Sequence, residues 1–179
     1  MPTKLVALIR GINVGKAKRV AMADLRALVE KLGYGDVRTL LNSGNVVFTS
    51  ANADARDAAR RIEDGMSAKL GVSARVTVLT AAELAAAVKS NPLLEVADNP
   101  SRLMMAVLLD PADRRKLEPL LKQDWSPEAL ALGKRRFSAM ESLRPTSCTR
   151  KCSAGFFLVA IFLAWSSLQS VGLDEAGIL

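Results

Sequence analysis

The order of apolar patterns in the first eighty residues constrains the fold of this chain most strongly. Short apolar or alternating runs typical of β-strands lie at residues 4–9, 36–41, 46–49 and 74–79. Residues 21–32 place apolar side chains three and four apart, as in an amphipathic helix. Residues 53–70 form a second expected helix, capped by Asn52 or Asp54 and ended by Gly71. The order strand–helix–strand–strand–helix–strand predicts a ferredoxin-like (α/β-plait) first subdomain over residues 1–80.

The second half of the chain begins to repeat this order. A capping box at Thr80–Glu83 predicts a helix to about Ser90, and residues 81–100 are expected to be this helix and an irregular connection. Further elements are expected in the order strand, helix and strand, at residues 103–109, 111–122 and 129–137. The predicted fold class is therefore α+β, with tandem ferredoxin-like subdomains of which the second, residues 101–137, is incomplete.

Charge and composition narrow the classes of function. The 179 residues carry a formal net charge of +7, which favours anionic partners such as phosphate compounds or a nucleic-acid backbone. The chain has no histidine, and its two cysteines, Cys148 and Cys152, have neither the spacing nor the companions of a zinc site. We expect no metal and no cofactor. No signal-peptide pattern follows Met1, so a cytoplasmic protein is expected.

The candidate site is a basic, glycine-containing segment between the first strand and the first helix. Its expected ligand-binding residues, with those of the turn after the second strand, are Arg10, Gly11, Asn13, Gly15, Lys16, Ser43, Gly44 and Asn45. Lys18 and Arg19 add an electrostatic patch. In a βαββαβ unit the first and second strands run parallel, so the loop and the turn are expected on one edge of the sheet. Glycines and a following helix start let backbone N–H groups approach a phosphate.

Other interpretations of the same residues remain open. The glycines of both segments also suit tight turns, and the lysines also suit a solvated surface. The loop does not match a Walker A pattern, because Ala17 stands where a magnesium-binding Ser or Thr belongs. No nucleophile–base pair is recognisable, so catalysis is not expected. The alternatives are a nucleic-acid-binding module and an enzyme acting on a phosphorylated small molecule. The strand at 74–79 alternates polar and apolar residues, which predicts one wet face.

Four sequence blocks resemble one bacterial family, the domain of unknown function 1697 (DUF1697). The blocks are Leu8–Gly15 (LIRGINVG), Met22–Arg26 (MADLR), Val37–Thr39 (VRT) and Asn42–Phe48 (NSGNVVF). Their order and spacing match the family over roughly residues 3–135. The resemblance implies two ferredoxin-like subdomains and no known activity, because the family has no established catalytic residues.

The tail, residues 138–179, departs from that family. Members typically continue with an aromatic strand, a glycine-containing turn and a helix, and none of these patterns follows Arg135. One interpretation is a reading-frame shift near residues 134–137. The other is a native tail, in which the apolar run Gly155–Trp165 forms a buried helix or strand. A membrane anchor is not favoured, because a spanning helix needs about 20 apolar residues.

Overall fold

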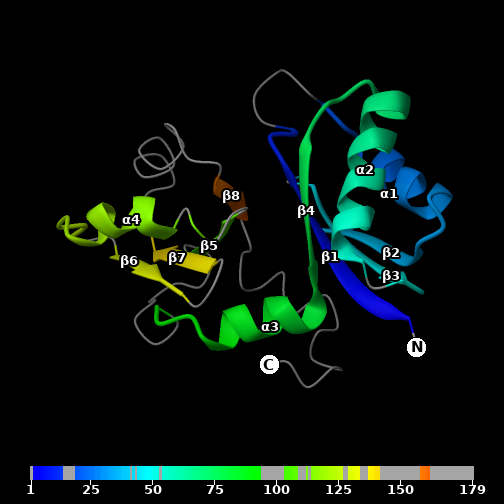
Figure 1. Cartoon of the computed structure of the whole chain (residues 1–179). Helices are drawn as coiled ribbons and strands as arrows, with labels where there is room; N and C mark the ends of the chain where they lie inside the picture. Colours follow the sequence, from blue (N-terminus) through cyan, green and yellow to red (C-terminus); the bar gives the residue numbers. More distant parts are fainter. Residues whose placement is uncertain are drawn as a thin grey trace. The chain divides into compact units, whose positions relative to one another are not determined.

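The computed structural model describes residues 2–13, 19–40, 42, 44–52, 54–93, 103–108, 112, 114–126, 129–133, 137–141 and 158–161. The chain divides into two compact units, Met1–Leu84 and Ala85–Leu179. Each unit contains one four-stranded antiparallel sheet, and the described residues include four helices (Figure 1). The mixed α/β character expected from the sequence is therefore confirmed.

The first unit contains the six elements that the sequence predicts, in the predicted order. They are β1 (Thr3–Arg10), α1 (Met22–Lys31), β2 (Gly35–Leu40), β3 (Asn45–Ser50), α2 (Ala55–Leu70) and β4 (Arg75–Thr80). The strands lie in the order β2-β3-β1-β4, and every neighbouring pair is antiparallel. Since β3 is antiparallel to both β1 and β2, these two strands run parallel to each other.

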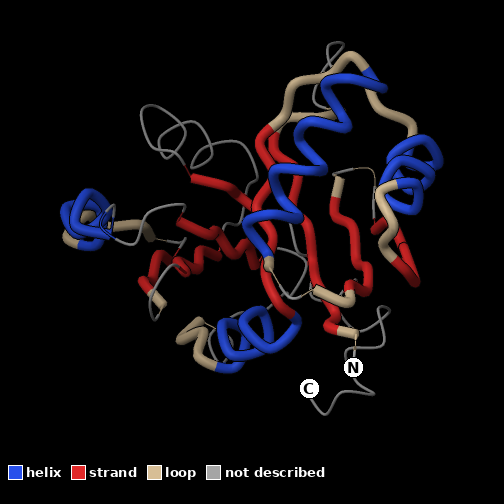
Figure 2. The backbone as a smooth tube through the Cα atoms, turned by 45° about the vertical axis from the view of Figure 1, so that its right-hand side comes forward, coloured by secondary structure: helices blue, strands red, loops and turns tan. Residues whose placement is uncertain are grey.

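The register of the first sheet separates its side chains into two faces. Leu5, Ala7 and Ile9 of β1 belong to the main hydrophobic core, together with residues of α1 and α2. Both helices lie on that face of the sheet (Figure 2). The alternate positions of β1, including Val6, Leu8 and Arg10, lie on the opposite face. Val6 and Leu8 are also buried, which explains why β1 is a continuous apolar run rather than an alternating one.

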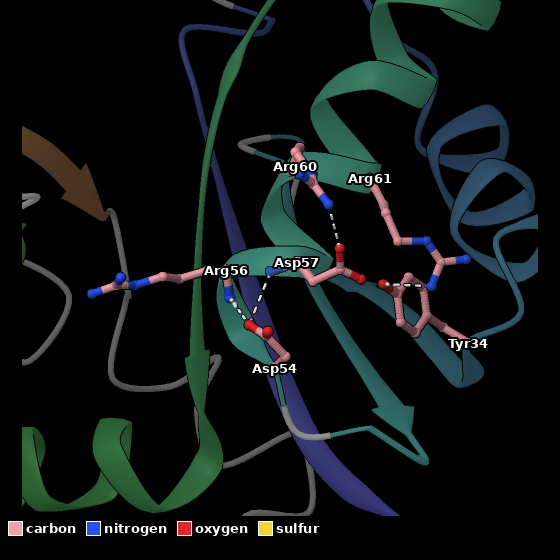
Figure 3. Close-up of polar contacts among 6 residues, drawn as sticks. All are labelled: Tyr34, Asp54, Arg56, Asp57, Arg60 and Arg61. Carbon is pink, nitrogen blue, oxygen red and sulfur yellow. Dashed lines mark hydrogen bonds and ion pairs between the residues drawn. The ribbon is translucent and has the colours of Figure 1, made fainter.

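Local hydrogen bonds define the ends of α2. The Asp54 carboxylate accepts hydrogen bonds from the N–H groups of Arg56 and Asp57, at 2.9 and 3.0 Å (Figure 3). These bonds satisfy two N–H groups that have no partner within the helix. At the other end Gly71 takes a left-handed conformation with φ of 65°. Both boundaries agree with the capping residues expected from the sequence.

Tyr34 joins the end of α1 to α2. Its ring packs against Phe48 with centroids 4.6 Å apart, and the Arg61 guanidinium lies 5.2 Å from its centroid. Arg61 also donates a hydrogen bond to the Tyr34 hydroxyl (Figure 3). A second hydrogen bond runs from Arg61 to the carbonyl of Leu32. Burial raises the pKa of the Tyr34 phenol, the nearby Arg61 charge opposes this, and Asp57 adds to it. This cluster serves packing at the edge of the sheet remote from the candidate site.

The capping box after β4 is confirmed. The Thr80 N–H donates to the Glu83 carboxylate at 2.9 Å, and the Glu83 N–H donates to the Thr80 hydroxyl at 3.1 Å. These reciprocal bonds begin α3 (Ala81–Lys89) immediately after the strand.

The second unit contains a sheet with the strand order β6-β7-β5-β8. Its elements are β5 (Leu103–Leu108), α4 (Arg114–Leu121), β6 (Ala129–Leu132), β7 (Phe137–Glu141) and β8 (Leu158–Ile161). Within the described residues, no helix has the length and apolar character needed to cross a membrane.

Two expectations for the second unit need correction. The single strand expected at residues 129–137 is two strands, β6 and β7, which pair antiparallel, so the chain reverses direction between Leu132 and Phe137. The expectation of an incomplete unit is also wrong for the sheet, because β8 pairs with β5 as a fourth strand. Residues 158–161 of the apolar run in the tail form β8, and the rest of residues 155–165, expected to be a buried helix or strand, lies outside the described residues. Residues 142–157 and 162–179, with both cysteines, lie outside the described residues.

Candidate functional site

The ends of four strands define the candidate edge of the first sheet. β1 ends at Arg10 and β2 at Leu40, while β3 begins at Asn45 and β4 at Arg75. Leu8 of β1 and Leu40 of β2 both pair with Asn45, so the two strands end side by side around β3. The segment after β1 and the turn after β2 therefore leave the sheet at one edge, as the parallel arrangement of these strands requires.

The side chain of Asn13 ties the loop to the turn. Its amide nitrogen donates hydrogen bonds to the carbonyls of Val20 and Asn42, both at 2.9 Å. Its amide oxygen accepts a hydrogen bond from the Val20 N–H at 2.8 Å. Both amide protons and the oxygen are thus used within the protein. Asn13, one of the expected ligand-binding residues, closes the base of the loop in the structure and holds its end beside the turn.

Gly44 lets the turn approach the loop closely. Its φ is 87°, and a Cβ added there would lie 2.6 Å from Cδ1 of Ile12. Ile12 is 2% exposed, so it has little room to move. By contrast, a Cβ on Gly11, whose φ is 76°, would meet no atom within 4 Å. The two glycines therefore differ, since Gly11 supplies only a backbone conformation and Gly44 also supplies space.

Two arginines face each other where β1 and β4 meet this edge. Arg10 is directly opposite Arg75 in the antiparallel register, so their Cα atoms are about 5 Å apart. Arg75 is exposed and Arg10 is half-buried. Within the described part of the chain, the ion pairs are Arg26–Glu30 and Arg60–Asp57, and neither edge arginine takes part in one. Like charges directly opposite each other in a sheet are destabilising.

Two buried polar residues, Asn45 and Thr77, lie next to the arginine pair on the same face. Leu8 of β1 is flanked by Asn45 of β3 and Thr77 of β4, which are 4% and 6% exposed. The Thr77 hydroxyl is buried and has no hydrogen-bond partner, a unique case among the described side chains. The expectation that β4 has one wet face is therefore wrong at Thr77, and holds at Arg75, which lies at the end of the strand.

Several expected site residues lie outside the described residues, namely Gly15, Lys16, Lys18 and Ser43. Arg19 is described and exposed. No group of three or more potential metal ligands occurs within the described ranges. The described residues at this edge therefore offer arginine side chains and hydrogen-bonding groups to a ligand.

Sequence reasoning missed Arg75 and Thr77 as site candidates. Their spacing of two residues on an alternating strand signals a shared face. Their position opposite Arg10 and Leu8 depends on the register between β1 and β4, which are separated by more than sixty residues. The sequence pattern does not specify that register, so the arginine pair becomes visible only in the structure.

Comparison with known proteins agrees with this architecture. The family model described as "Protein of unknown function (DUF1697)" matches residues 2–137, which is more than half of the chain. The chain therefore belongs to the DUF1697 family, whose function is unknown. No curated protein matches the chain.

A solved structure extends the comparison to most of the molecule. The conserved bacterial protein SP0830 from Streptococcus pneumoniae shares the fold with a TM-score of 0.65 and 22% sequence identity. The match covers 87% of this chain and 85% of that chain. The fold is thus shared across both proteins, while the family and this structure leave the activity unassigned.

Proposed function

We propose that the protein is a tandem of two ferredoxin-like units, and that the first unit binds a phosphate-bearing anion at the edge where β1 and β2 end. The equivalent strand orders β2-β3-β1-β4 and β6-β7-β5-β8 support the tandem arrangement. The three hydrogen bonds of Asn13 carry the proposal for the site, because they hold the basic loop and the turn together.

The charge around this edge supports an anionic ligand. Residues 10–19 contain Arg10, Lys16, Lys18 and Arg19 and no acidic residue. Arg75 adds a fifth cation from β4. Guanidinium groups bind phosphate through paired, charge-assisted hydrogen bonds, and backbone N–H groups of a glycine-containing loop add neutral donors. This combination favours a phosphate group over an uncharged ligand.

Thermal unfolding of the full chain in the presence of pyrophosphate, at constant ionic strength, tests the proposal. A ligand present at 100 times its dissociation constant stabilises the native state by about 2.7 kcal/mol, which raises the melting temperature by about 5 °C or more in a protein of this size. The double variant Lys18→Gln/Arg19→Gln is expected to lose most of this shift. The control Lys31→Gln/Arg56→Gln removes two exposed cations at the opposite edge and is expected to keep it.

Two results would reject the proposal. One is no shift with pyrophosphate in the unaltered protein, and the other is an equal loss in both double variants. A single-stranded oligonucleotide forms a second arm of the experiment. Strong binding of the oligonucleotide that falls steeply with salt, without a pyrophosphate shift, would favour a nucleic-acid-binding module instead.

A further inference from the structure

We infer that Arg10, Arg75 and Thr77 form an anion site on the sheet face opposite α1 and α2, and that its occupant is a dianionic phosphate group. This inference rests on the proposed function, because it shares Arg10 and names the face of the sheet on which the anion lies. It adds two residues of β4 that lie outside the basic loop.

The first argument is the arginine pair. Arg10 and Arg75 are cross-strand neighbours, and neither has an anionic partner among the described residues. Two arginines whose Cα atoms are about 5 Å apart place like charges on neighbouring positions of one face, which is unfavourable without an anion, and both can bind one anion. A phosphate oxygen can accept from each guanidinium, which converts the repulsion into charge-assisted hydrogen bonds.

The unpaired Thr77 hydroxyl supports an anion site independently of the arginine pair. Thr77 is 6% exposed, and its Oγ1 has no hydrogen-bond partner. Leaving a buried hydroxyl unpaired costs free energy, so such groups normally have partners. Thr77 and Arg75 are two residues apart on β4 and therefore share a face, with Cα atoms about 7 Å apart. An anion bound between the arginine pair and Thr77 would place an oxygen within reach of the Thr77 hydroxyl.

Charge favours a terminal phosphate as the occupant. The two guanidinium groups together carry two positive charges, which a phosphate monoester matches and a phosphodiester linkage, with one negative charge, does not. The Thr77 hydroxyl donates to a phosphate oxygen in the same way as hydroxyl groups of other phosphate sites. The inferred ligand is therefore inorganic phosphate or a molecule with a terminal phosphate, rather than an internal nucleic-acid linkage.

Isothermal titration of the full chain with inorganic phosphate tests the inference, with sodium chloride at equal ionic strength as the reference. Arg75→Gln is expected to weaken phosphate binding about tenfold or more, because it removes a charge-assisted contact. Thr77→Val is expected to weaken it several-fold, and Thr77→Ser, which keeps the hydroxyl, is expected to bind as the unaltered protein does. The matched control is Arg38→Gln, which removes an exposed arginine of the same face on β2.

The outcomes separate this inference from the broader proposal. If Arg75→Gln and Arg38→Gln weaken binding equally, or if Thr77→Val binds normally, the inference is overturned. Loss of binding in Lys18→Gln/Arg19→Gln but not in Arg75→Gln would keep the loop site and reject this one. The reverse pattern would support the Arg10–Arg75–Thr77 site and reject the loop. Absence of phosphate binding in the unaltered protein would overturn the inference. An oligonucleotide without terminal phosphate is expected not to compete, and competition by it would reject the monoester preference.

Discussion

The two sheets of this protein differ at the end of the opening strand, the strand that comes first in each sheet along the sequence, which is β1 in the first sheet and β5 in the second. In the first sheet, the last register pair of β1 and β4 is Arg10 opposite Arg75. In the second sheet, the last register pair of β5 and β8 is Leu108 opposite Leu158. The opening strand is central, and its partner is an edge strand, in both sheets. One topological position therefore carries two cations in the first unit and two apolar residues in the second.

The strand arrangement therefore does not require the arginine pair. An apolar pair satisfies the same register in the second sheet, whereas opposed like charges cost stability in the first. The segments after β1 and β5 also differ in charge, since residues 10–19 contain no acidic residue, whereas residues 109–116 contain Asp110 and Asp113 beside three cations. We conclude that the same register position carries an arginine pair in the first unit and a leucine pair in the second, as expected when function lies in residues placed on a shared fold.

The largest predicted effect is on stability, and it tests whether the turn at Gly44 packs closely against Ile12 at the cationic edge. Gly44→Ala is expected to lower the free energy of unfolding by about 3 kcal/mol, because it adds a clash with Ile12 to a backbone of positive φ. Gly11→Ala, with positive φ but open space, is expected to cost only about 1 kcal/mol. Urea denaturation followed by circular dichroism measures both. Equal decreases in the free energy of unfolding for the two variants would show that Ile12 does not pack closely against Gly44.

The next effect concerns the tie between loop and turn. Asn13→Gly keeps the positive φ of 55° and removes three hydrogen bonds, so we expect a loss of about 2 kcal/mol in the free energy of unfolding. Asn52→Gly is the matched control, because it removes one local bond to the Asp54 N–H at the opposite edge. Its expected cost is below about 1 kcal/mol. A loss for Asn13→Gly no larger than that of the control would mean that the loop is not held by this side chain.

Two threonines of β4 are expected to respond with opposite signs. Thr77→Val replaces an unpaired buried hydroxyl by a methyl group, which we expect to raise the free energy of unfolding by about 1 kcal/mol without phosphate. Thr80→Val breaks the capping box of α3 and is expected to lower it by about 1 kcal/mol. Denaturation in phosphate-free buffer measures both changes. Destabilisation by Thr77→Val would show that its hydroxyl already has a partner and is not available to an anion.

The smallest effect concerns pH and lies away from the cationic edge. Burial raises the pKa of Tyr34 above its ordinary value of 10.0. The folded protein therefore keeps the phenol proton longer than the unfolded chain does, so this stabilisation is complete below pH 10 and is lost as pH rises through the folded-state pKa. Tyr34 is the sole tyrosine, so ultraviolet titration of the phenolate reports it directly. A folded-state midpoint equal to that in urea would contradict this expectation.

Much of the first unit could be predicted from its sequence, because local signals act there together. Each local signal determines one element: the apolar run predicts β1. Asp54 and Gly71 set the two ends of α2, and the Thr80–Glu83 capping box begins α3. The split between β6 and β7 was missed because residues 129–137 were predicted as one strand, although Gly133 and the charged residues 134–136 interrupt the apolar run. The partners of Asn13 and the pairing of Arg10 with Arg75 depend on residues distant in sequence. Such contacts follow from packing and register rather than from local patterns.

If the arginine pair serves anion binding, replacing it by the leucine pair of the second sheet abolishes that binding. The double variant Arg10→Leu/Arg75→Leu gives the first unit the leucine pair found in the second. Melting temperatures would be measured for this variant and the unaltered protein, with inorganic phosphate or with chloride at equal ionic strength. We expect the variant to be at least as stable as the unaltered protein in chloride and to gain nothing from phosphate, while the unaltered protein is stabilised by phosphate. An equal phosphate-dependent stabilisation in both proteins would show that the arginine pair does not serve anion binding.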